Sequence, residues 1–319
     1  MSAPSVLRIG TRASALALWQ ARHVAQLIGA QCGAPDTPLR HISTAGDVQS
    51  EVPLWQADGR AFFTREIDRA LLEGTVDAAV HSLKDMPTQL DEGLTLAAVL
   101  ARADARDALV SRGGTPLAAL PRGARIGTSS LRRRAFLARL RPDAELLELR
   151  GNVPTRIERL QRGDYDAVVL AAAGLARLGL ERHVSEYLDP EDLPPAVSQG
   201  AIAVCARAGD AATLAWLAAL DDAPTRLAVS AERALLAHLQ GGCQVPLGAL
   251  ATLREGTLAL QASVCALDGS QRLSARAAVA TGRSGAAEAL GRRVAEQLLE
   301  RGAAALIAAV RATHAVEEP

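Results

Sequence analysis

Hydrophobic and polar positions along the chain predict helices and strands that alternate. Residues 65–73 and 155–162 have the spacing of amphipathic helices, and a glycine, Gly74 or Gly163, follows each of them. A short apolar run comes next, at residues 76–80 and again at 166–169, and is typical of a buried strand in a parallel sheet. This order of elements predicts an α/β fold whose sheets are mainly parallel.

Two pairs of matching segments indicate an internal duplication. Arg8-Ile9-Gly10-Thr11 recurs as Arg125-Ile126-Gly127-Thr128, and residues 74–80 resemble residues 163–169 in the same order. The short charged segment 102–107 separates the two copies and predicts a crossover. We therefore expect two related α/β lobes, the first in residues 1–100 and the second in residues 106–195.

The remaining sequence predicts a return to the first lobe and then a third domain. Residues 201–205 are apolar enough for a strand and 211–220 for a buried helix, so residues 201–220 are assigned to lobe 1. Beyond a boundary at 221–224 we expect a helix at 227–239, short strands across 247–280 with a turn at Asp268-Gly269, and one long helix at about 286–311. Residues 223–319 are thus predicted to form a small C-terminal α+β domain.

One strand ends in a run of polar residues. His81, Ser82, Lys84 and Asp85 follow the apolar run, and Pro87 stops regular structure. Ligands of open α/β sheets sit beyond the carboxyl ends of strands, which favours a site here. Lys84 is the single lysine among 35 basic residues, and an amine offers chemistry that a guanidinium does not. A surface lysine, or one paired with Asp85, is the alternative.

Composition limits the possible partners and compartments. The net charge is zero, so no global field recruits nucleic acid or an anionic membrane. No apolar run reaches the length of a membrane span, which is about 18–20 residues. Arg8 and Arg12 interrupt the N-terminal region where a signal peptide would be apolar, which favours a cytoplasmic protein.

The four cysteines show no metal-binding spacing. Cys32, Cys205 and Cys265 suit buried thiols, and we expect no metal site. Cys243 differs because it lies in the segment Gly241-Gly242-Cys243-Gln244-Val245-Pro246, which is typical of a surface loop.

Arginines and hydroxyl residues gather at predicted strand ends in lobe 2. A strand that leads through Gly and Thr or Ser into a helix offers backbone N–H groups to an anion, although Ser14, Ser129 or Ser130 could instead act only as helix N-caps. Arginine binds carboxylates in a bidentate way. Some of these arginines, Arg134 above all, suit a solvated face. Nucleic acid is the competing partner, but aromatic residues make up 3% of the chain and few lie among the arginines.

Five segments together resemble the porphobilinogen deaminases, also called hydroxymethylbilane synthases. They are 10–14 (GTRAS), 81–87 (HSLKDMP), 127–133 (GTSSLRR), 149–153 (LRGNV) and 241–246 (GGCQVP), in order over nearly the whole chain. The resemblance implies three domains, two of them like the lobes of type II periplasmic binding proteins. It also implies head-to-tail condensation of four porphobilinogen molecules to hydroxymethylbilane, with release of ammonia, on a covalent dipyrromethane cofactor.

The resemblance also implies roles for individual residues. Asp85 would be catalytic, and Cys243 would carry the dipyrromethane through a thioether. Further cofactor contacts would come from Ser82, Lys84, Thr128, Ser129, Ser130, Arg132, Arg133 and Arg150, and substrate contacts from Arg12, Ser14, Arg156 and Arg177. The partner would be porphobilinogen alone, with no nucleic acid or membrane, and the protein a monomer.

Two departures from the family pattern concern motion rather than chemistry. The lysine-bearing, glycine-rich loop of the family reads 56–62 (QADGRAF) here, and Ser198 replaces a glycine in the connector 196–200. Two other classes of protein are the alternatives. A two-lobed solute-binding protein predicts a signal peptide and no role for Cys243. A nucleic-acid-binding regulator predicts a helix-turn-helix or a basic stripe, and the sequence shows neither.

Overall fold

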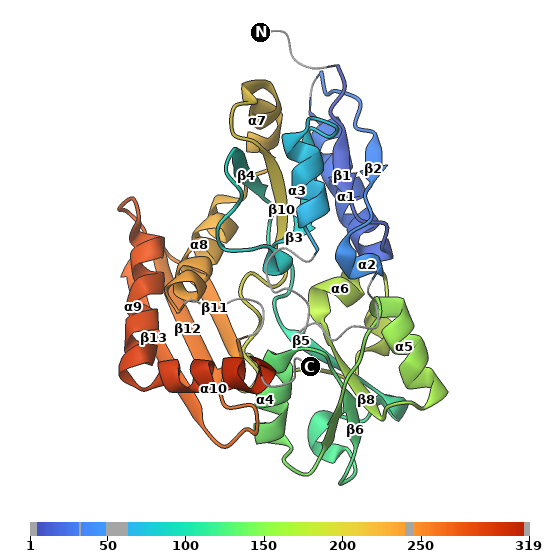
Figure 1. Ribbon diagram of the computed structural model, residues 1–319, viewed down its shortest axis with the longest axis vertical. Coiled ribbons are helices and arrows are strands. Elements are labelled where there is room, and N and C mark those ends of the chain that lie inside the picture. The colour runs from blue at the N-terminus through green and yellow to red at the C-terminus, as the bar shows by residue number, and fades with distance from the viewer. Residues whose placement is uncertain (1–4, 32, 49–62, 240–244, 316–319) are drawn as a thin grey trace. The chain divides into compact units, whose positions relative to one another are not determined.

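The computed structural model describes residues 5–31, 33–48, 63–239 and 245–315 (Figure 1). The described residues form two compact units. The first contains those of Met1–Ser50, Arg60–Ala103 and Gly200–Arg226, and the second those of Asp104–Gln199 and Leu227–Pro319. Within the described ranges, no helix is both long enough and apolar enough to cross a membrane.

The first unit is built on a five-stranded sheet. Its strands are β1 (Ile9–Thr11), β2 (Leu39–His41), β3 (Ala78–Ser82), β4 (Leu94–Val99) and β10 (Ile202–Arg207), in the spatial order β2-β1-β3-β10-β4. The pairs β1–β2 and β1–β3 are parallel, whereas β10 runs antiparallel to both β3 and β4. The expected return strand is therefore confirmed, and the sheet is mainly parallel in strand direction, because four strands share one direction and β10 is reversed. The late strand enters between two early ones in the opposite direction.

Helices cover the two faces of this sheet. They are α1 (Ala15–Gly29), α2 (Ala45–Val48), α3 (Arg65–Leu72) and α7 (Ala211–Ala218). Successive strand residues point to opposite faces, and Ile9 joins α1 and α7 in one hydrophobic core. Its neighbour Gly10 faces α3, where a Cβ on Gly10 would lie 3.3 Å from Ile67. Gly10 thus lets α3 approach β1 closely.

Lobe 2, within the second unit, repeats the strand order of the first sheet. Its strands are β5 (Asp107–Ser111), β6 (Arg125–Gly127), β7 (Glu145–Leu147), β8 (Ala167–Ala171) and β9 (Glu186–Tyr187), in the order β7-β6-β8-β5-β9. Here too the first two pairs are parallel and the other two antiparallel. The charged segment 102–107 is not wholly a crossover, because β5 begins at Asp107. The helices are α4 (Leu131–Leu140), α5 (Val153–Arg162) and α6 (Ala172–Arg177).

One ion pair recurs in both lobes and explains the sequence repeat. The backbone N and side-chain Nε of Arg8 both donate to Asp77 Oδ2, at 2.9 and 2.8 Å. Arg125 donates to Asp166 Oδ2 in the same way, at 2.9 and 3.3 Å. Each pair joins the start of an R-I-G-T segment to the start of the next parallel strand. The matched residues therefore occupy equivalent places in two copies of one α/β lobe, as the duplication predicted.

The C-terminal domain packs helices on an antiparallel sheet. Its elements are α8 (Ala223–His238), β11 (Leu247–Arg254), β12 (Thr257–Cys265), β13 (Arg272–Ala280), α9 (Ala286–Glu300) and α10 (Ala303–Ala315). The helix expected at 227–239 begins earlier, because α8 starts at Ala223, within the segment 221–224. The single long helix expected at 286–311 is also wrong. Gly302 has φ +97°, which an α-helix does not allow, so α9 ends and a second helix starts.

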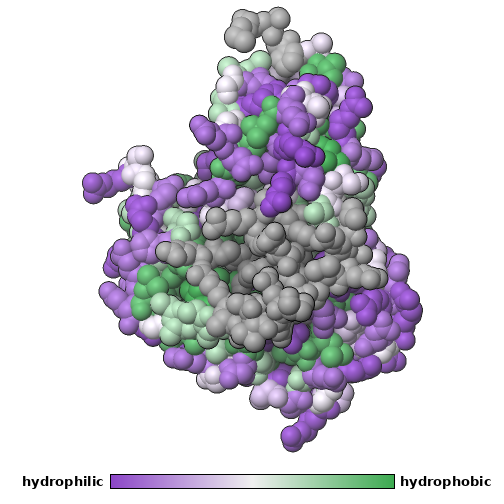
Figure 2. Space-filling model, in the orientation of Figure 1, coloured by the Kyte–Doolittle hydropathy of each residue, from purple (hydrophilic) through white to green (hydrophobic). Residues whose placement is uncertain are grey.

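The surface offers little exposed apolar area. Among the described residues, the large hydrophobic side chains that stay exposed are scattered: Val6, Leu27, Leu72 and Tyr187. Hydrophilic residues cover most of the coloured surface in the view of Figure 2. Single exposed side chains of this kind are normal for a globular protein and do not mark an interface.

Candidate active site

The polar run after the apolar strand lies where the sequence predicted it. β3 ends at Ser82, and Leu83–Asp85 form a single 3-10 turn closed by a hydrogen bond from Met86 N to Leu83 O at 3.2 Å. Leu83 is fully buried and anchors the turn in the core. Ser82, Lys84 and Asp85 are half-buried. The fold therefore presents polar side chains at the carboxyl end of a central strand.

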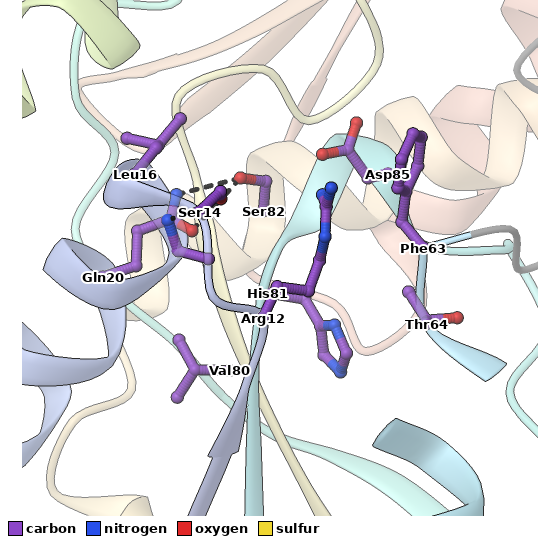
Figure 3. Close-up of a pocket in the computed structure, with 11 residues that line it drawn as sticks. Arg12, Ser14, Leu16, Gln20, Phe63, Thr64, Val80, His81, Ser82 and Asp85 are labelled. Carbon is purple, nitrogen blue, oxygen red and sulfur yellow. Dashed lines mark hydrogen bonds between the residues drawn. The ribbon is translucent and has the colours of Figure 1, made fainter. Parts of the chain in front are cut away.

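A small cavity of about 70 Å³ lies beside this turn (Figure 3). It brings together four residues that the resemblance marks, from two segments far apart in the sequence: Arg12, Ser14, Ser82 and Asp85. The other lining residues are Leu16, Ala17, Gln20, Phe63, Thr64, Val80 and His81. Lys84 shares the turn with Asp85 but is not part of this lining. In Figure 3 the Asp85 carboxylate and the Arg12 side chain lie on the same side of the cavity.

Two residues of the cavity were missed by sequence reasoning. Gln20 is buried on α1, where its Nε2 donates to Ser82 Oγ at 2.9 Å. Phe63 lies under Arg12, whose Cζ is 4.3 Å from the ring centroid. A glutamine on the core-facing side of a helix was the available signal for the first. Together these contacts fix the hydroxyl of Ser82 and the guanidinium of Arg12.

His81, one of the residues that line the cavity, forms a buried polar pair with Asp68. Its Nε2 lies 3.5 Å from Asp68 Oδ1, and the two side chains are 3% and 6% exposed. Neither atom has a hydrogen-bond partner among the described residues, and the same holds for Thr64 Oγ1. Since His81 points away from Asp85 in Figure 3, this pair supports the wall rather than facing Asp85.

In lobe 2 the hydroxyl residues form the start of a helix. Ser130 caps α4, its Oγ accepting a hydrogen bond from Arg133 N at 3.4 Å, and Thr128 Oγ1 accepts one from Ser130 N at 3.3 Å. Ser14 caps α1 in the same manner, accepting from Ala17 N at 3.4 Å. The capping interpretation is thus confirmed for Ser14 and Ser130. Capping leaves other backbone N–H groups of the first turn available to an anion.

Arg132 and Arg133 converge on one buried carboxylate. Arg132 Nη1 donates to Asp107 Oδ2 at 2.7 Å, and Arg133 Nη2 donates to Asp107 Oδ1, also at 2.7 Å. Gln199 Nε2 donates to the same Oδ1 at 2.8 Å. Burial would raise the pKa of Asp107, but the charges and hydrogen bonds of the two arginines outweigh burial and hold the pKa well below its usual range.

This cluster carries a net positive charge inside the protein. Two guanidinium groups face the single carboxylate of Asp107, and Arg132 Nε is buried without a hydrogen-bond partner in the described part of the chain. Unpaired buried charge is costly. An anion near α4 would therefore be stabilised, which fits a ligand that carries carboxylates.

The remaining marked arginines lie at the ends of β7 and in α5 and α6. Arg156 Nε donates to Gly151 O at 2.7 Å, which places its side chain over the turn after Arg150. Burial lowers the pKa of Arg150, with Glu148 opposing, and lowers the pKa of Arg177 to about 10. Both guanidinium groups are thus partly withdrawn from water. Cys243 and the segment 56–62 lie outside the described residues.

The two remaining cysteines agree with the expectation of buried thiols. Cys205 and Cys265 are fully buried in strands β10 and β12. Burial raises the pKa of Cys265, and its Sγ lies 3.5 Å from Ala135 O in α4. A protonated, enclosed thiol of this kind is chemically inert. Cys32, like Cys243, lies outside the described residues.

Comparison with known proteins places these features in one family. Residues 7–215 match the family model described as porphobilinogen deaminase, dipyromethane cofactor binding domain, and residues 226–300 match the C-terminal domain of the same family. A porphobilinogen deaminase of Roseiflexus castenholzii is 49% identical over 95% of this chain and 98% of its own length. One from Syntrophotalea carbinolica is 47% identical over 97% of each chain.

Among solved structures, the methionine-binding protein MetQ aligns with 68% of this chain and 89% of its own, at a TM-score of 0.44 and 13% identity. The family models and the two full-length relatives are decisive, because they span both lobes and the C-terminal domain. The chain belongs to the porphobilinogen deaminase family.

Proposed function

We propose that this chain is a hydroxymethylbilane synthase that condenses four porphobilinogen molecules head to tail and releases one ammonia per condensation. The observation that carries the proposal is the cavity at the end of β3, where Asp85 and Ser82 meet Arg12 and Ser14. It lies in the part of the chain matched by the cofactor-binding domain of the family. Bound dipyrromethane, attached through a thioether to Cys243, supplies the free pyrrole position from which the product is extended.

Asp85 is proposed as the catalytic group. In each condensation the C–N bond of the aminomethyl group breaks, ammonia leaves, and the substrate becomes a cationic methylene-pyrrolenine. A carboxylate fixed in a partly desolvated cavity stabilises that developing positive charge. The turn Leu83–Asp85 holds the carboxylate in place, because Leu83 is buried in the core. The same carboxylate can take and return a proton during the bond changes.

The arginines and hydroxyl residues are proposed to bind carboxylates of the substrate and the growing chain. Substrate contacts are assigned to Arg12 and Ser14 in the first unit and to Arg156 and Arg177 in lobe 2. Contacts to the cofactor are assigned to Ser82, Lys84, Thr128, Ser129, Ser130, Arg132, Arg133 and Arg150. The net positive charge of the buried cluster formed by Arg132, Arg133 and Asp107 supports the assignment of Arg132 and Arg133, since it favours an added anion.

We further propose a cytoplasmic monomer that binds no nucleic acid, membrane or metal. The proposed domains are residues 1–100 with 201–220, residues 106–195, and residues 223–319. The strand orders of the two sheets support these divisions.

The first test replaces Asp85 by asparagine, which removes the charge at nearly constant volume. Loss of one hydrogen bond to a charged group costs roughly 1.5–3 kcal/mol, so turnover should fall by about one to two decades. Porphobilinogen consumption and product are followed with Ehrlich's reagent, which reacts with pyrroles that have a free α-position. Glu92→Gln, at an exposed carboxylate seven positions on, is the matched control. Unchanged turnover in Asp85→Asn would refute the assignment.

The second test concerns the covalent attachment. Intact mass spectrometry under denaturing, reducing conditions should show a protein heavier than its sequence by two linked pyrrole units, with peptide mapping placing them on Cys243. Cys32, Cys205 and Cys265 should be unmodified. A Cys243→Ser protein should lack the adduct and be inactive. Active protein at its bare sequence mass would contradict the covalent primer.

A further inference from the structure

Glu148 is a carboxylate placed among the arginines of lobe 2. It follows β7 directly and stands two residues before Arg150. Leu149, between them in the sequence, is fully buried in the core. Tyr165 fixes the main chain at this point, because its hydroxyl donates to Glu148 O at 2.7 Å. The position of Glu148 is therefore set by the fold.

Three arginines act electrostatically on the Glu148 carboxylate. They are Arg134 of α4, Arg150 after β7 and Arg156 of α5. The other titratable neighbour is Tyr165, which lies two residues before β8. Arg156 is drawn toward the same turn by its hydrogen bond to Gly151 O. Burial raises the pKa of Glu148, and the three arginines offset only part of that effect. Its Oε1 is buried without a hydrogen-bond partner among the described residues.

We propose that Glu148 is a resident carboxylate that lowers the affinity of the cluster Arg134, Arg150 and Arg156 for carboxylate-bearing pyrroles. With Glu148 ionised the three arginines carry a net charge of two, and with Glu148 neutral they carry three. The residue thus weakens the hold on the substrate and on the lengthening product, which has to be released. This role rests on the proposed function, which assigns Arg150 and Arg156 to carboxylate binding.

The physical reason is competition for the same cations. A ligand carboxylate that approaches the cluster meets attraction from the arginines and repulsion from Glu148. As the pH falls through the raised pKa of Glu148, the carboxyl takes up a proton and the repulsion ends. Affinity for carboxylate ligands should therefore increase toward lower pH, until the ligand carboxyls themselves are protonated near about pH 4.

The variant Glu148→Gln removes the charge and keeps the shape. The KM for porphobilinogen should fall by about three- to tenfold, as expected for the loss of one like charge in a partly exposed site. The rise in affinity toward lower pH should be lost in this variant, because the titrating group is gone. Glu145→Gln, on the same strand but exposed, is the matched control and should keep the wild-type KM and profile. Glu148→Ala serves if the glutamine variant folds poorly.

A second readout does not depend on turnover. Citrate, a simple polycarboxylate, is added to each holoprotein and the rise in melting temperature is measured. The rise should be larger in Glu148→Gln than in wild type or Glu145→Gln, and it should shrink in Glu148→Gln combined with Arg150→Leu. An unchanged or higher KM in Glu148→Gln, or an equal citrate effect in all proteins, would overturn the proposal. If no protein turns over porphobilinogen, the proposed function fails and the citrate comparison still decides the role of Glu148.

Discussion

Replacing Asp107 by asparagine should loosen lobe 2 more than any single surface change. The wild-type carboxylate is fully buried and accepts hydrogen bonds from Arg132, Arg133 and Gln199. Asparagine keeps the volume but leaves two buried guanidinium groups without a counter-charge. Breaking a buried ion pair from one side costs roughly 3–5 kcal/mol. We expect a loss of that size, confined mainly to the strands that the arginines join.

The assay has to report on lobe 2 alone, because the described tryptophans, Trp19 and Trp216, pack against the core of the first unit. Hydrogen exchange followed by mass spectrometry does so, through peptides that cover β5 and β8. The free energy of opening that these peptides report should fall by about 3–5 kcal/mol, so their exchange should become faster. Peptides of β1 and β3 should change less.

The matched control is Asp104→Asn. Asp104 pairs with Arg106 at 2.7 Å, but both side chains are more than a third exposed, so the pair is worth about 1 kcal/mol or less. Because the pKa of Asp107 is lowered in the folded protein, its stabilisation is present above the unfolded pKa and is lost only as the pH falls through the folded one. The difference between wild type and Asp107→Asn should therefore be constant from about pH 5 upward. Equal exchange in both variants would refute the reasoning.

Three further predictions concern the connector, a helix contact and the cavity. Ser198 has φ 63° and a buried hydroxyl without a partner among the described residues. Because glycine adopts this φ without strain and has no hydroxyl to bury, Ser198→Gly should raise the free energy of unfolding by up to about 1 kcal/mol, and the melting temperature with it. A lower melting temperature would show that the backbone at Ser198 is not strained. A Cβ on Gly291 would lie 2.3 Å from Ala231 O, so Gly291→Ala should cost about 1–3 kcal/mol in thermal unfolding, whereas Gly282→Ala, with open space around it, should not. Gln20→Leu removes the hydrogen bond to Ser82 and should slow porphobilinogen turnover about fivefold, for a loss near 1 kcal/mol, as measured with Ehrlich's reagent; wild-type turnover would show that Ser82 needs no such support.

Local signals in the sequence predicted the parts of the fold that depend on neighbours along the chain. The R-I-G-T repeats, the glycine-closed helices and the strand end at Ser82 all depend on residues within a few positions, and they are found where expected. The break between α9 and α10 also had a local signal, Gly302, but a long alanine-rich stretch on either side favoured one continuous helix.

Contacts between distant residues could not be predicted in this way. The direction of β10 relative to β3 depends on a strand that comes more than a hundred residues later. The arginine cluster shows the same limit at the candidate site. The sequence marks Arg132 and Arg133 as cations, but nothing near them in the chain indicates that Asp107, 25 positions before Arg132, neutralises part of their charge. Gln20 and Ser82, 62 positions apart, are a second example.

The place of β10 has a consequence for synthesis of the chain on the ribosome. Lobe 2 draws all five of its strands from Asp107–Tyr187, so its sheet can close as soon as that stretch has emerged. The first unit begins earlier but finishes later, because β3 and β4 meet only through β10, which ends at Arg207. Until then both strands present open edges, which are sites for aggregation or for a chaperone. The sheet of lobe 2 can thus close before the sheet of the first unit, and truncation before Ile202 should leave β3 and β4 unjoined while the five strands of lobe 2 are all present.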